Sequence, residues 1–171
     1  MKRLTLVRHA KSSWRNPDLP DFERPLNNRG EQDAPLMGRR LAERNLAPDL
    51  LLVSPARRTR LTAEAIAEQL AVATTRITFD ERIYLATAGE LIKLLQAIDE
   101  ERRDVLLVGH NPGITDLANY LVGGRLENVP TCGIFSVELP LTSWRHLERA
   151  AGTLLFYDYP KKAKQTLTAD G

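Results

Sequence analysis

The sequence has 171 residues, of which 43% are hydrophobic and 27% charged, with a formal net charge of +2. That length and composition supply the core of one domain, which we expect over residues 1–160, followed by a polar tail at 161–171. The small net charge does not require a polyanion-binding role, and we expect no nucleic-acid partner.

The single cysteine, Cys132, cannot form an internal disulfide, which favours a reducing compartment. The first apolar run spans only Leu4–Val7 and is too short for a signal peptide. No run reaches the roughly 18 apolar residues that a membrane helix needs. We therefore expect a cytoplasmic protein that has no membrane partner, while the sequence leaves the oligomeric state undetermined.

The first predicted element is the strand Leu4–Val7, whose uninterrupted apolar pattern is typical of a central strand buried on both faces. A helix follows, because Asn28 and Glu31 have the spacing of a capping box and apolar residues continue after them. Pro35 lies inside this segment and predicts a kink or a split.

The next strand is Leu50–Val53, and the segment Ala56–Leu70 behind it predicts a helix because it contains no Gly or Pro. A further helix is indicated by apolar residues at helical spacing from Leu91 to Ile98.

A third buried strand is expected at Val105–Val108, followed by a helix with Asn111 as its N-cap and Pro112 as its first residue. The segments Ile134–Leu139 and Thr153–Tyr157 predict strands toward one edge. Alternating strands and helices indicate an α/β three-layer sandwich, in which helices flank a mostly parallel central sheet.

Three of these strands end in polar clusters, in the stretches "LTLVRHA", "LLLVSPARRTR" and "VLLVGHNPG". Ligands of open α/β sheets bind beyond the carboxyl ends of parallel strands, so the three clusters converge if the strands are neighbours. The converging side chains are Arg8, His9, His110 and either Arg57 or Arg58. Such a pocket suits a phosphate-like anion, and a neutral imidazole within it can attack phosphorus. Arginine neighbours repel a metal cation, so we expect no metal and no cofactor.

These motifs, in this order, resemble the histidine phosphatase (phosphoglycerate-mutase-like) superfamily. The stretches that carry the likeness are Arg8-His9, "SPARRTRLTA" from Ser54 and "GHNPG" from Gly109. The short chain, together with "DFERPLNNRG" from Asp21 and "VPTCGIFSVEL" from Val129, is similar to the SixA-type phosphohistidine phosphatases. The resemblance extends from about residue 4 to residue 139.

The resemblance implies a role for each matching residue. His9 matches the nucleophile that becomes phosphorylated, and Arg8 matches the phosphate-binding arginine beside it. Arg58, rather than Arg57, matches the arginine of the Ser-Pro-x-x-Arg pattern. His110 matches the second histidine, which contacts the phosphoryl oxygens.

Three further residues are weaker matches. Arg24 resembles an additional anion contact of the short members, although an ion pair with Asp21 or Glu23 explains it equally well. Asp21 lies where those members place a carboxylate near the site mouth and is a candidate for proton transfer. Many relatives carry a glutamate that acts as the general acid where this sequence has Leu85. Glu81 is nearby, but it could act as that acid only if the alignment with the relatives were shifted.

The missing acid favours phosphohistidine, because an imidazole leaving group needs less protonation than an alkoxide. We therefore expect a phosphohistidine-containing protein as substrate. One alternative is a broad-specificity or small-molecule phosphomonoesterase of the same superfamily with Glu81 as its acid. Another, from a different class, is a non-catalytic module that binds phosphate or phosphoprotein. Arg57, Arg60 and His146 are expected on the surface, and Cys132 is expected to be buried.

Overall fold

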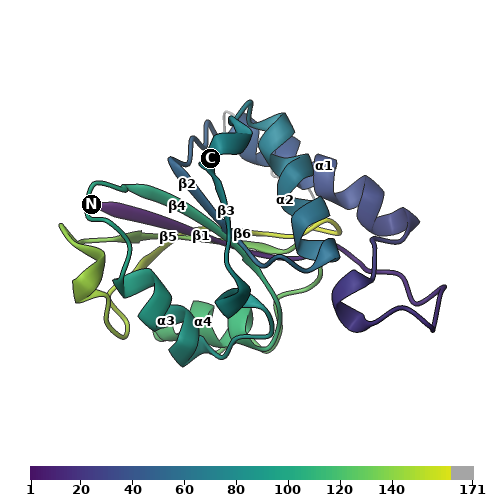
Figure 1. The fold of residues 1–171 in the computed structure, drawn as a ribbon. Helices are drawn as coiled ribbons and strands as arrows, with labels where there is room; N and C mark the ends of the chain where they lie inside the picture. The colour runs from purple at the N-terminus through teal and green to yellow at the C-terminus, as the bar shows by residue number, and fades with distance from the viewer. Residues whose placement is uncertain (163–171) are drawn as a thin grey trace.

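The computed structural model describes residues 1–162, so nearly all of the predicted tail at 161–171 lies outside the described residues. Its centre is one six-stranded sheet in the order β3-β2-β4-β1-β5-β6 (Figure 1). The strands are β1 (Lys2–Arg8), β2 (Leu50–Val53), β3 (Ile77–Phe79), β4 (Asp104–Gly109), β5 (Ile134–Leu139) and β6 (Thr153–Asp158). The α-helices are α1 (Asn28–Glu43), α2 (Arg57–Gln69), α3 (Ala88–Gln96) and α4 (Gly113–Val122). Four 3-10 turns complete the set: η1 (Asp21–Glu23), η2 (Thr74–Arg76), η3 (Glu81–Ile83) and η4 (Trp144–His146).

The predicted mostly parallel sheet is confirmed. Strands β3, β2, β4 and β1 are parallel neighbours, whereas β5 and β6 continue the sheet in antiparallel fashion. In register, Val108 of β4 pairs with Val7 of β1 and with Val53 of β2, so the three polar strand ends lie side by side. Strand β3 was not predicted, because its three residues, one half-buried and two exposed, carry no apolar run.

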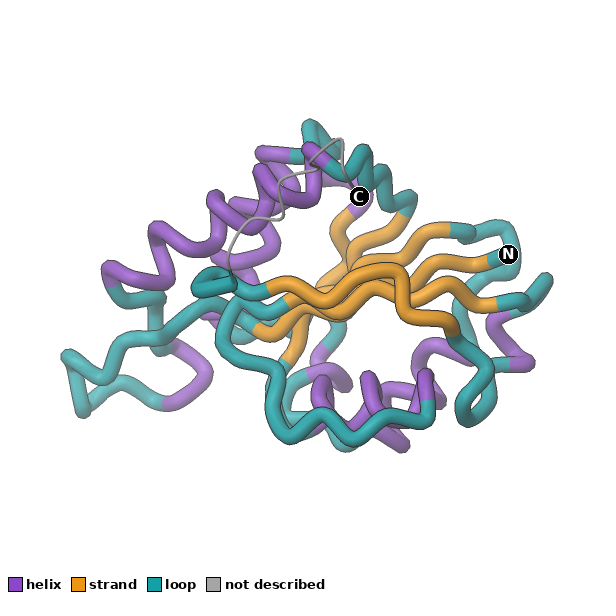
Figure 2. The backbone as a smooth tube through the Cα atoms, turned by 180° about the vertical axis from the view of Figure 1, so that it is seen from behind, coloured by secondary structure: helices purple, strands orange, loops and turns teal. Residues whose placement is uncertain are grey.

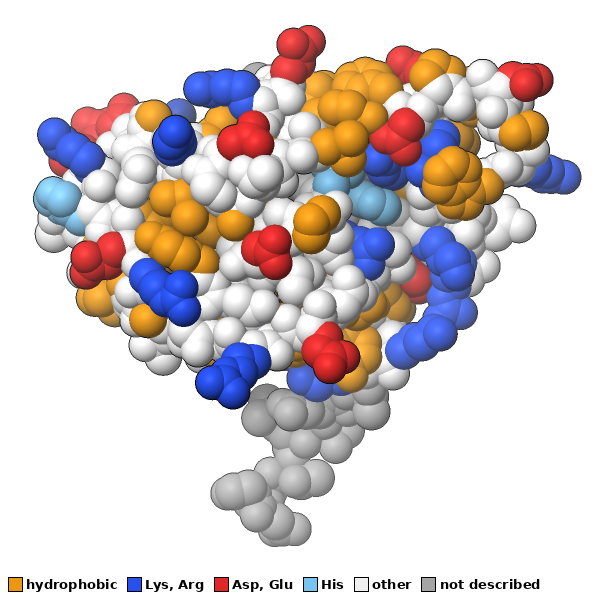
Figure 3. Space-filling model, turned by 90° about the horizontal axis from the view of Figure 1, so that it is seen from below, with side chains coloured by type: hydrophobic (Ala, Val, Ile, Leu, Met, Phe, Trp, Pro, Cys, Tyr) orange, Lys and Arg blue, Asp and Glu red, His pale blue; other side chains and the backbone are white. Residues whose placement is uncertain are grey.

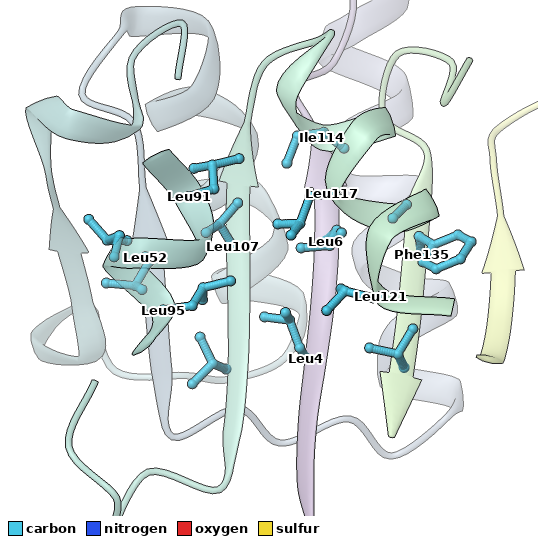
Figure 4. Close-up of a cluster of buried hydrophobic side chains, with 14 of the residues drawn as sticks. Leu4, Leu6, Leu52, Leu91, Leu95, Leu107, Ile114, Leu117, Leu121 and Phe135 are labelled. Atoms are coloured by element: carbon cyan, nitrogen blue, oxygen red, sulfur yellow. The ribbon is translucent and has the colours of Figure 1, made fainter. Parts of the chain in front are cut away.

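The predicted three layers are also confirmed. Helices α1 and α2 cover one face of the sheet, and α3 and α4 cover the other (Figures 1 and 2). On the α3–α4 face, Leu91 and Leu117 pack with Leu6 and Leu107 from the strands (Figure 4). Full burial of such a side chain stabilises the fold by about 1.5–3 kcal/mol, so this face anchors the strands that carry the polar ends. Among residues 1–162, no helix is long and apolar enough to cross a membrane.

Of the kink or split predicted at Pro35, the split is wrong, because α1 is one continuous helix from Asn28 to Glu43. A proline inside a helix costs about 3 kcal/mol, and the fully buried Met37 and Leu41 on the same helix offset that cost. The N-cap also differs by one residue. Asn27, not Asn28, accepts a 2.9 Å hydrogen bond from the Gly30 amide.

Helix α4 begins at Gly113, one residue later than expected. The side chain of Asn111 still accepts hydrogen bonds from Thr115, at 3.2 Å from its amide and 2.8 Å from its hydroxyl. A Cβ on Gly113 would lie 2.1 Å from the Ala86 carbonyl oxygen. Only glycine allows this close approach, which brings the start of α4 against the segment that follows η3.

Candidate active site

The backbone around His9 is held by the strands on both sides of it. The His9 amide donates to Gly109 O of β4 at 3.1 Å, and the Arg8 amide donates to Gly133 O at 3.1 Å. The buried Cys132 amide donates to the carbonyls of both Arg8 and His9 at 3.0 Å. The main chain is therefore fixed where β1 ends, and His9 projects from a rigid strand exit rather than from a loop.

The imidazole of His9 is oriented by its own chain. Its Nδ1 lies 2.7 Å from the Ala10 carbonyl oxygen, which can only accept, so Nδ1 carries the proton and Nε2 keeps its lone pair. Only 8% of the residue is exposed. Burial lowers the pKa of His9 to about 4, and the positive charges of Arg58, Arg8 and Arg24 add to that shift. At neutral pH this imidazole is uncharged and nucleophilic.

His110 follows β4 and faces His9, with 5.4 Å between the ring centroids. Its Nδ1 accepts from Nη2 of Arg58 at 3.3 Å, so the proton lies on Nε2, which donates to Oγ of Ser54 at 2.8 Å. Burial, followed by the charge of Arg58, lowers the pKa of His110 to about 3. The second histidine is therefore also neutral at pH 7.

Arg58 is the arginine that reaches this cluster, as the sequence predicted. It is buried near the start of α2, whereas Arg57 is half-buried and Arg60 is exposed. Nη1 of Arg58 donates to the Asp21 main-chain oxygen at 2.8 Å, and Nη2 donates to Oδ2 of Asp21 at 2.9 Å. Since Arg58 also touches His110, it links the second strand exit to the third.

Arg8 reaches the site from β1. Its Nη1 donates to the Val129 carbonyl at 3.0 Å, and burial lowers its pKa from the usual value. Its Nε is buried and has no hydrogen-bond partner among residues 1–162. A buried donor without a hydrogen-bond partner destabilises the folded protein by about 1–3 kcal/mol.

Asp21, on the 3-10 turn η1, lies at the mouth of the site with 42% of its side chain exposed. Its carboxylate accepts from Arg58, from Nη1 of Arg24 at 3.0 Å and from the Tyr84 hydroxyl at 2.5 Å. Partial burial opposes ionisation, but the hydrogen bonds from Tyr84, Arg58 and Arg24 lower the pKa of Asp21 to about 2. The carboxylate of Asp21 is therefore ionised at neutral pH and remains paired with Arg58 and Arg24.

Arg24 forms the ion pair with Asp21 that the sequence left open as an alternative. Its Nε and Nη2 donate to Ser13 O at 3.2 Å and to Ser12 Oγ at 2.5 Å. The guanidinium also stacks on Trp14, with 3.2 Å between Cζ and the ring centroid. All three nitrogens of Arg24 thus have partners, and the stack holds the group flat beside the site.

Other predicted residues lie apart from this cluster of contacts. Glu81 is exposed on η3, and its side chain forms no hydrogen bond or ion pair with any residue from 1 to 162. His146 is exposed, as expected. Cys132 is fully buried, as expected, and burial raises the pKa of its thiol, which argues against a thiolate nucleophile.

Sequence reasoning missed Tyr84, whose ring meets His110 edge-on at a centroid distance of 5.4 Å. The only signal was its position next to Leu85, where relatives place an acid. Leu85 itself is 57% exposed and has a φ of +52°, an uncommon conformation for a leucine. The hydroxyl of Ser54, which begins the second motif, accepts the hydrogen bond from Nε2 of His110.

Together these groups form a cluster of arginines and two neutral imidazoles at the carboxyl edge of three parallel strands. Figure 3 shows this face, with Lys and Arg side chains and hydrophobic side chains beside the pale-blue histidines in its right half. Within the described residues, no group of three or more His, Cys, Asp or Glu side chains could hold a metal ion. The pocket can bind a tetrahedral anion and present Nε2 of His9 to it.

Comparison with known sequences places the chain among phosphatases. The family model of the histidine phosphatase superfamily (branch 1) matches residues 4–93. An uncharacterised protein of Mycobacterium leprae is 33% identical over 167 residues, covering 91% of this chain and all of that protein.

Solved structures share the fold. SixA from Agrobacterium tumefaciens is 28% identical, with a TM-score of 0.79 that covers 93% of this chain and 98% of that one. A structure of the protein histidine phosphatase SixA with tungstate gives a TM-score of 0.78 at 24% identity, covering 92% of this chain and 97% of that one. At that identity the second match supports the fold alone.

Proposed function

Because the chain belongs to the histidine phosphatase superfamily (branch 1), we propose that it is a metal-independent protein phosphohistidine phosphatase with His9 as its nucleophile. One observation carries this proposal. The hydrogen bond from Nδ1 of His9 to Ala10 leaves the Nε2 lone pair free, and the ring is neutral beside three arginines. The name phosphohistidine phosphatase that the Agrobacterium SixA protein carries supports the same substrate class.

The first step transfers the phosphoryl group to the enzyme. Nε2 of His9 attacks phosphorus in line and the P–N bond of the substrate phosphohistidine breaks. The electron pair of that bond remains on the departing ring, which leaves as a neutral imidazole because its other nitrogen is protonated in the substrate. Arg8, with its unpaired Nε, and Arg58 bind the equatorial oxygens and stabilise the charge on them. His110 contacts the same oxygens through the proton on its Nε2. In the structure without substrate, that N–H group donates to Oγ of Ser54.

The second step regenerates the enzyme. A water oxygen attacks phosphorus, the P–Nε2 bond breaks, and its electron pair returns to His9 as inorganic phosphate forms. Nδ1 stays protonated throughout, because it donates its hydrogen bond to the Ala10 carbonyl in both steps. Both protons of the attacking water remain on inorganic phosphate, and His9 returns to its neutral form, so atoms and charges balance.

Proton supply to the leaving group distinguishes substrate classes. Asp21 is a carboxylate in the free enzyme, since its pKa is about 2, so it becomes an acid only if the phosphoryl charge raises that pKa. Arg24 orients this carboxylate through their ion pair. Within residues 1–162, the side chain of Glu81 forms no hydrogen bond or ion pair that would place it on a leaving group. An imidazole, which needs little protonation to leave, suits such a site better than an alkoxide.

The test follows the phosphoryl group. The protein is incubated with phosphoramidate, and acid-labile phosphate is mapped by mass spectrometry. We expect label on His9, no label in His9→Ala, and unchanged labelling in the control His146→Ala, whose histidine is exposed and remote in sequence from the motifs. Labelling at another residue, or full turnover by His9→Ala, would overturn the mechanism.

Substrate class is tested by comparing kcat/KM for a histidine-phosphorylated protein with that for p-nitrophenyl phosphate. We expect a clear preference for the phosphoprotein. A preference for the monoester, abolished in Glu81→Gln, would instead establish the phosphomonoesterase with Glu81 as its acid. Anion binding without turnover of either donor would identify a binding module.

A further inference from the structure

We propose that a second cavity, next to the phosphoryl site, binds a carboxylate side chain of the protein substrate. We call it the side pocket and define it by Lys11, Arg29, Asp33, Thr131, Tyr159 and Lys161. The proposal rests on the proposed function, because it supplies a contact for the polypeptide that carries the phosphohistidine. It predicts that substrates with acidic residues near the phosphohistidine are preferred.

The strand order places the side pocket at the same edge of the sheet as His9. In register, Val7 of β1 pairs with Ile134 at the start of β5, and Ile134 pairs with Asp158 at the end of β6. Lys11 follows β1, Thr131 precedes β5, and Tyr159 follows β6. The pocket therefore lies beyond β1, β5 and β6, whereas the phosphoryl site lies beyond β2, β4 and β1.

Backbone contacts tie the two sites together. The Cys132 amide, next to Thr131, donates to the carbonyl of His9, and the Lys11 carbonyl accepts from Asn27 at the start of α1. A Cβ on Gly30 would lie 2.2 Å from that Lys11 carbonyl, so the first turn of α1 packs directly on the chain two residues beyond the nucleophile. The floor of the pocket is thus as firmly fixed as His9.

The charges of the side pocket favour an anion. The ammonium groups of Lys11 and Lys161 form no hydrogen bond or ion pair with any residue from 1 to 162, and both residues are exposed at the surface. The one carboxylate, Asp33, is largely buried and already forms an ion pair with Arg29 at 3.3 Å. Three cations against one compensated carboxylate leave the pocket net positive and open to an incoming carboxylate.

Size and lining favour a peptide side chain over an isolated ion. The cavity has a volume of about 330 Å³, several times that of one carboxylate. Thr131 and Tyr159 offer hydroxyl donors, and the two prolines of the lining, Pro130 and Pro160, add apolar surface. The carboxylate of a Glu or Asp side chain can accept hydrogen bonds from these hydroxyls, while its methylene groups and the peptide backbone contact the prolines.

The experiment compares two synthetic phosphohistidine peptides that differ only in having Glu or Gln at the flanking positions. For the wild type at low ionic strength, kcat/KM should be about fivefold higher for the Glu peptide than for the Gln peptide. The two peptides should differ in KM and have the same kcat. That ratio should fall toward one in Lys11→Glu/Lys161→Glu and in 0.5 M salt, because exposed ion pairs are screened. The neutral pair Lys11→Gln/Lys161→Gln repeats the measurement if charge reversal impairs folding.

The matched control is Lys93→Glu, which makes the same charge change on the exposed surface of α3, in the opposite layer, and should keep the ratio. Equal loss on both peptides, or an unchanged ratio in both double variants, would overturn the side-pocket proposal. Binding of the unphosphorylated peptides, measured by fluorescence anisotropy, separates the two proposals. Glu-dependent binding without turnover would refute the proposed function alone, and turnover without Glu preference would refute the side pocket alone.

Discussion

The hydroxyl of Tyr84 donates a 2.5 Å hydrogen bond to Oδ2 of Asp21, although 63 residues separate them in the chain. The same oxygen accepts from Arg58, so a carboxylate of the protein occupies donors that the proposed mechanism assigns to phosphate. Substrate binding therefore has to displace Asp21 from Arg58 or share that guanidinium with it. This competition sets the affinity of the site for anions.

Asp21→Asn should tighten the inhibition by inorganic phosphate by about fivefold, or about 1 kcal/mol, because a competing charge is removed from Arg58. The measurement is the inhibition constant for phosphate at constant ionic strength. Asp18→Asn, at an exposed position in the same segment, is the charge-matched control and should leave the constant unchanged. Weaker inhibition in Asp21→Asn would show that Asp21 serves mainly to orient Arg58.

The two buried histidines should make stability fall in mild acid. Their folded pKa values, about 4 for His9 and about 3 for His110, lie below the usual 6.5, so the unfolded chain takes up protons first. Stability is therefore full above pH 6.5 and is lost as the pH falls toward 4. Between pH 7.5 and 5 each histidine should account for a loss of about 2 kcal/mol.

Urea unfolding at pH 7.5 and pH 5 measures this loss. His9→Gln should reduce the pH dependence, because glutamine does not titrate, whereas the exposed-site control His146→Gln should retain it. An NMR titration of the imidazole signals checks the same point directly. A pH dependence in His9→Gln equal to that of the wild type would contradict the prediction.

Asp104 has the opposite pH dependence at the far end of the sheet. Burial, and to a lesser degree repulsion from Asp49, raises its pKa to about 6, although Arg3 lies 3.7 Å away. Oδ1 of Asp104 and Oδ1 of Asp49 are both buried without a hydrogen-bond partner among residues 1–162. The folded protein holds this proton longer than the unfolded chain, so stability is lost as the pH rises from 4 through 6.

Asp104→Asn cannot ionise and should be more stable than the wild type by about 2 kcal/mol at pH 8, with no gain at pH 3.5. Urea unfolding of both proteins at the two pH values measures the difference. The exposed Asp18→Asn serves as control and should show no gain at pH 8. A stability gain that is the same at both pH values would point to packing rather than ionisation.

Gly113 tests how closely α4 must approach the segment after η3. Gly113→Ala places a Cβ 2.1 Å from the Ala86 carbonyl oxygen, so α4 must shift, and we expect a loss of about 2–4 kcal/mol. Since Ile114 donates to the His110 carbonyl, turnover should fall as well. The control Gly89→Ala, whose Cβ meets nothing closer than 3.9 Å at the start of α3, should stabilise by about 0.5–1 kcal/mol.

The sequence by itself determined the layers of the fold and four members of the site. Uninterrupted apolar runs identified β1, β2 and β4, since burial on both faces of a central strand leaves no room for polar residues. The resemblance to the family selected Arg58 over Arg57, and each run leads directly into polar residues, which include Arg8, His9 and His110. Local chemistry sufficed there, because a buried strand and its exit are adjacent in the chain.

Only the tertiary structure decided which side chains meet across the site. Tyr84, Asp21 and Ser54 come from segments with no mutual signal in the sequence, and their contacts depend on how η1, η3 and α2 pack over the strand ends. The same packing keeps α1 continuous through Pro35, because buried apolar area outweighs a local penalty. Hydrogen bonds between distant segments and depressed pKa values are products of burial, and burial is a property of the folded chain.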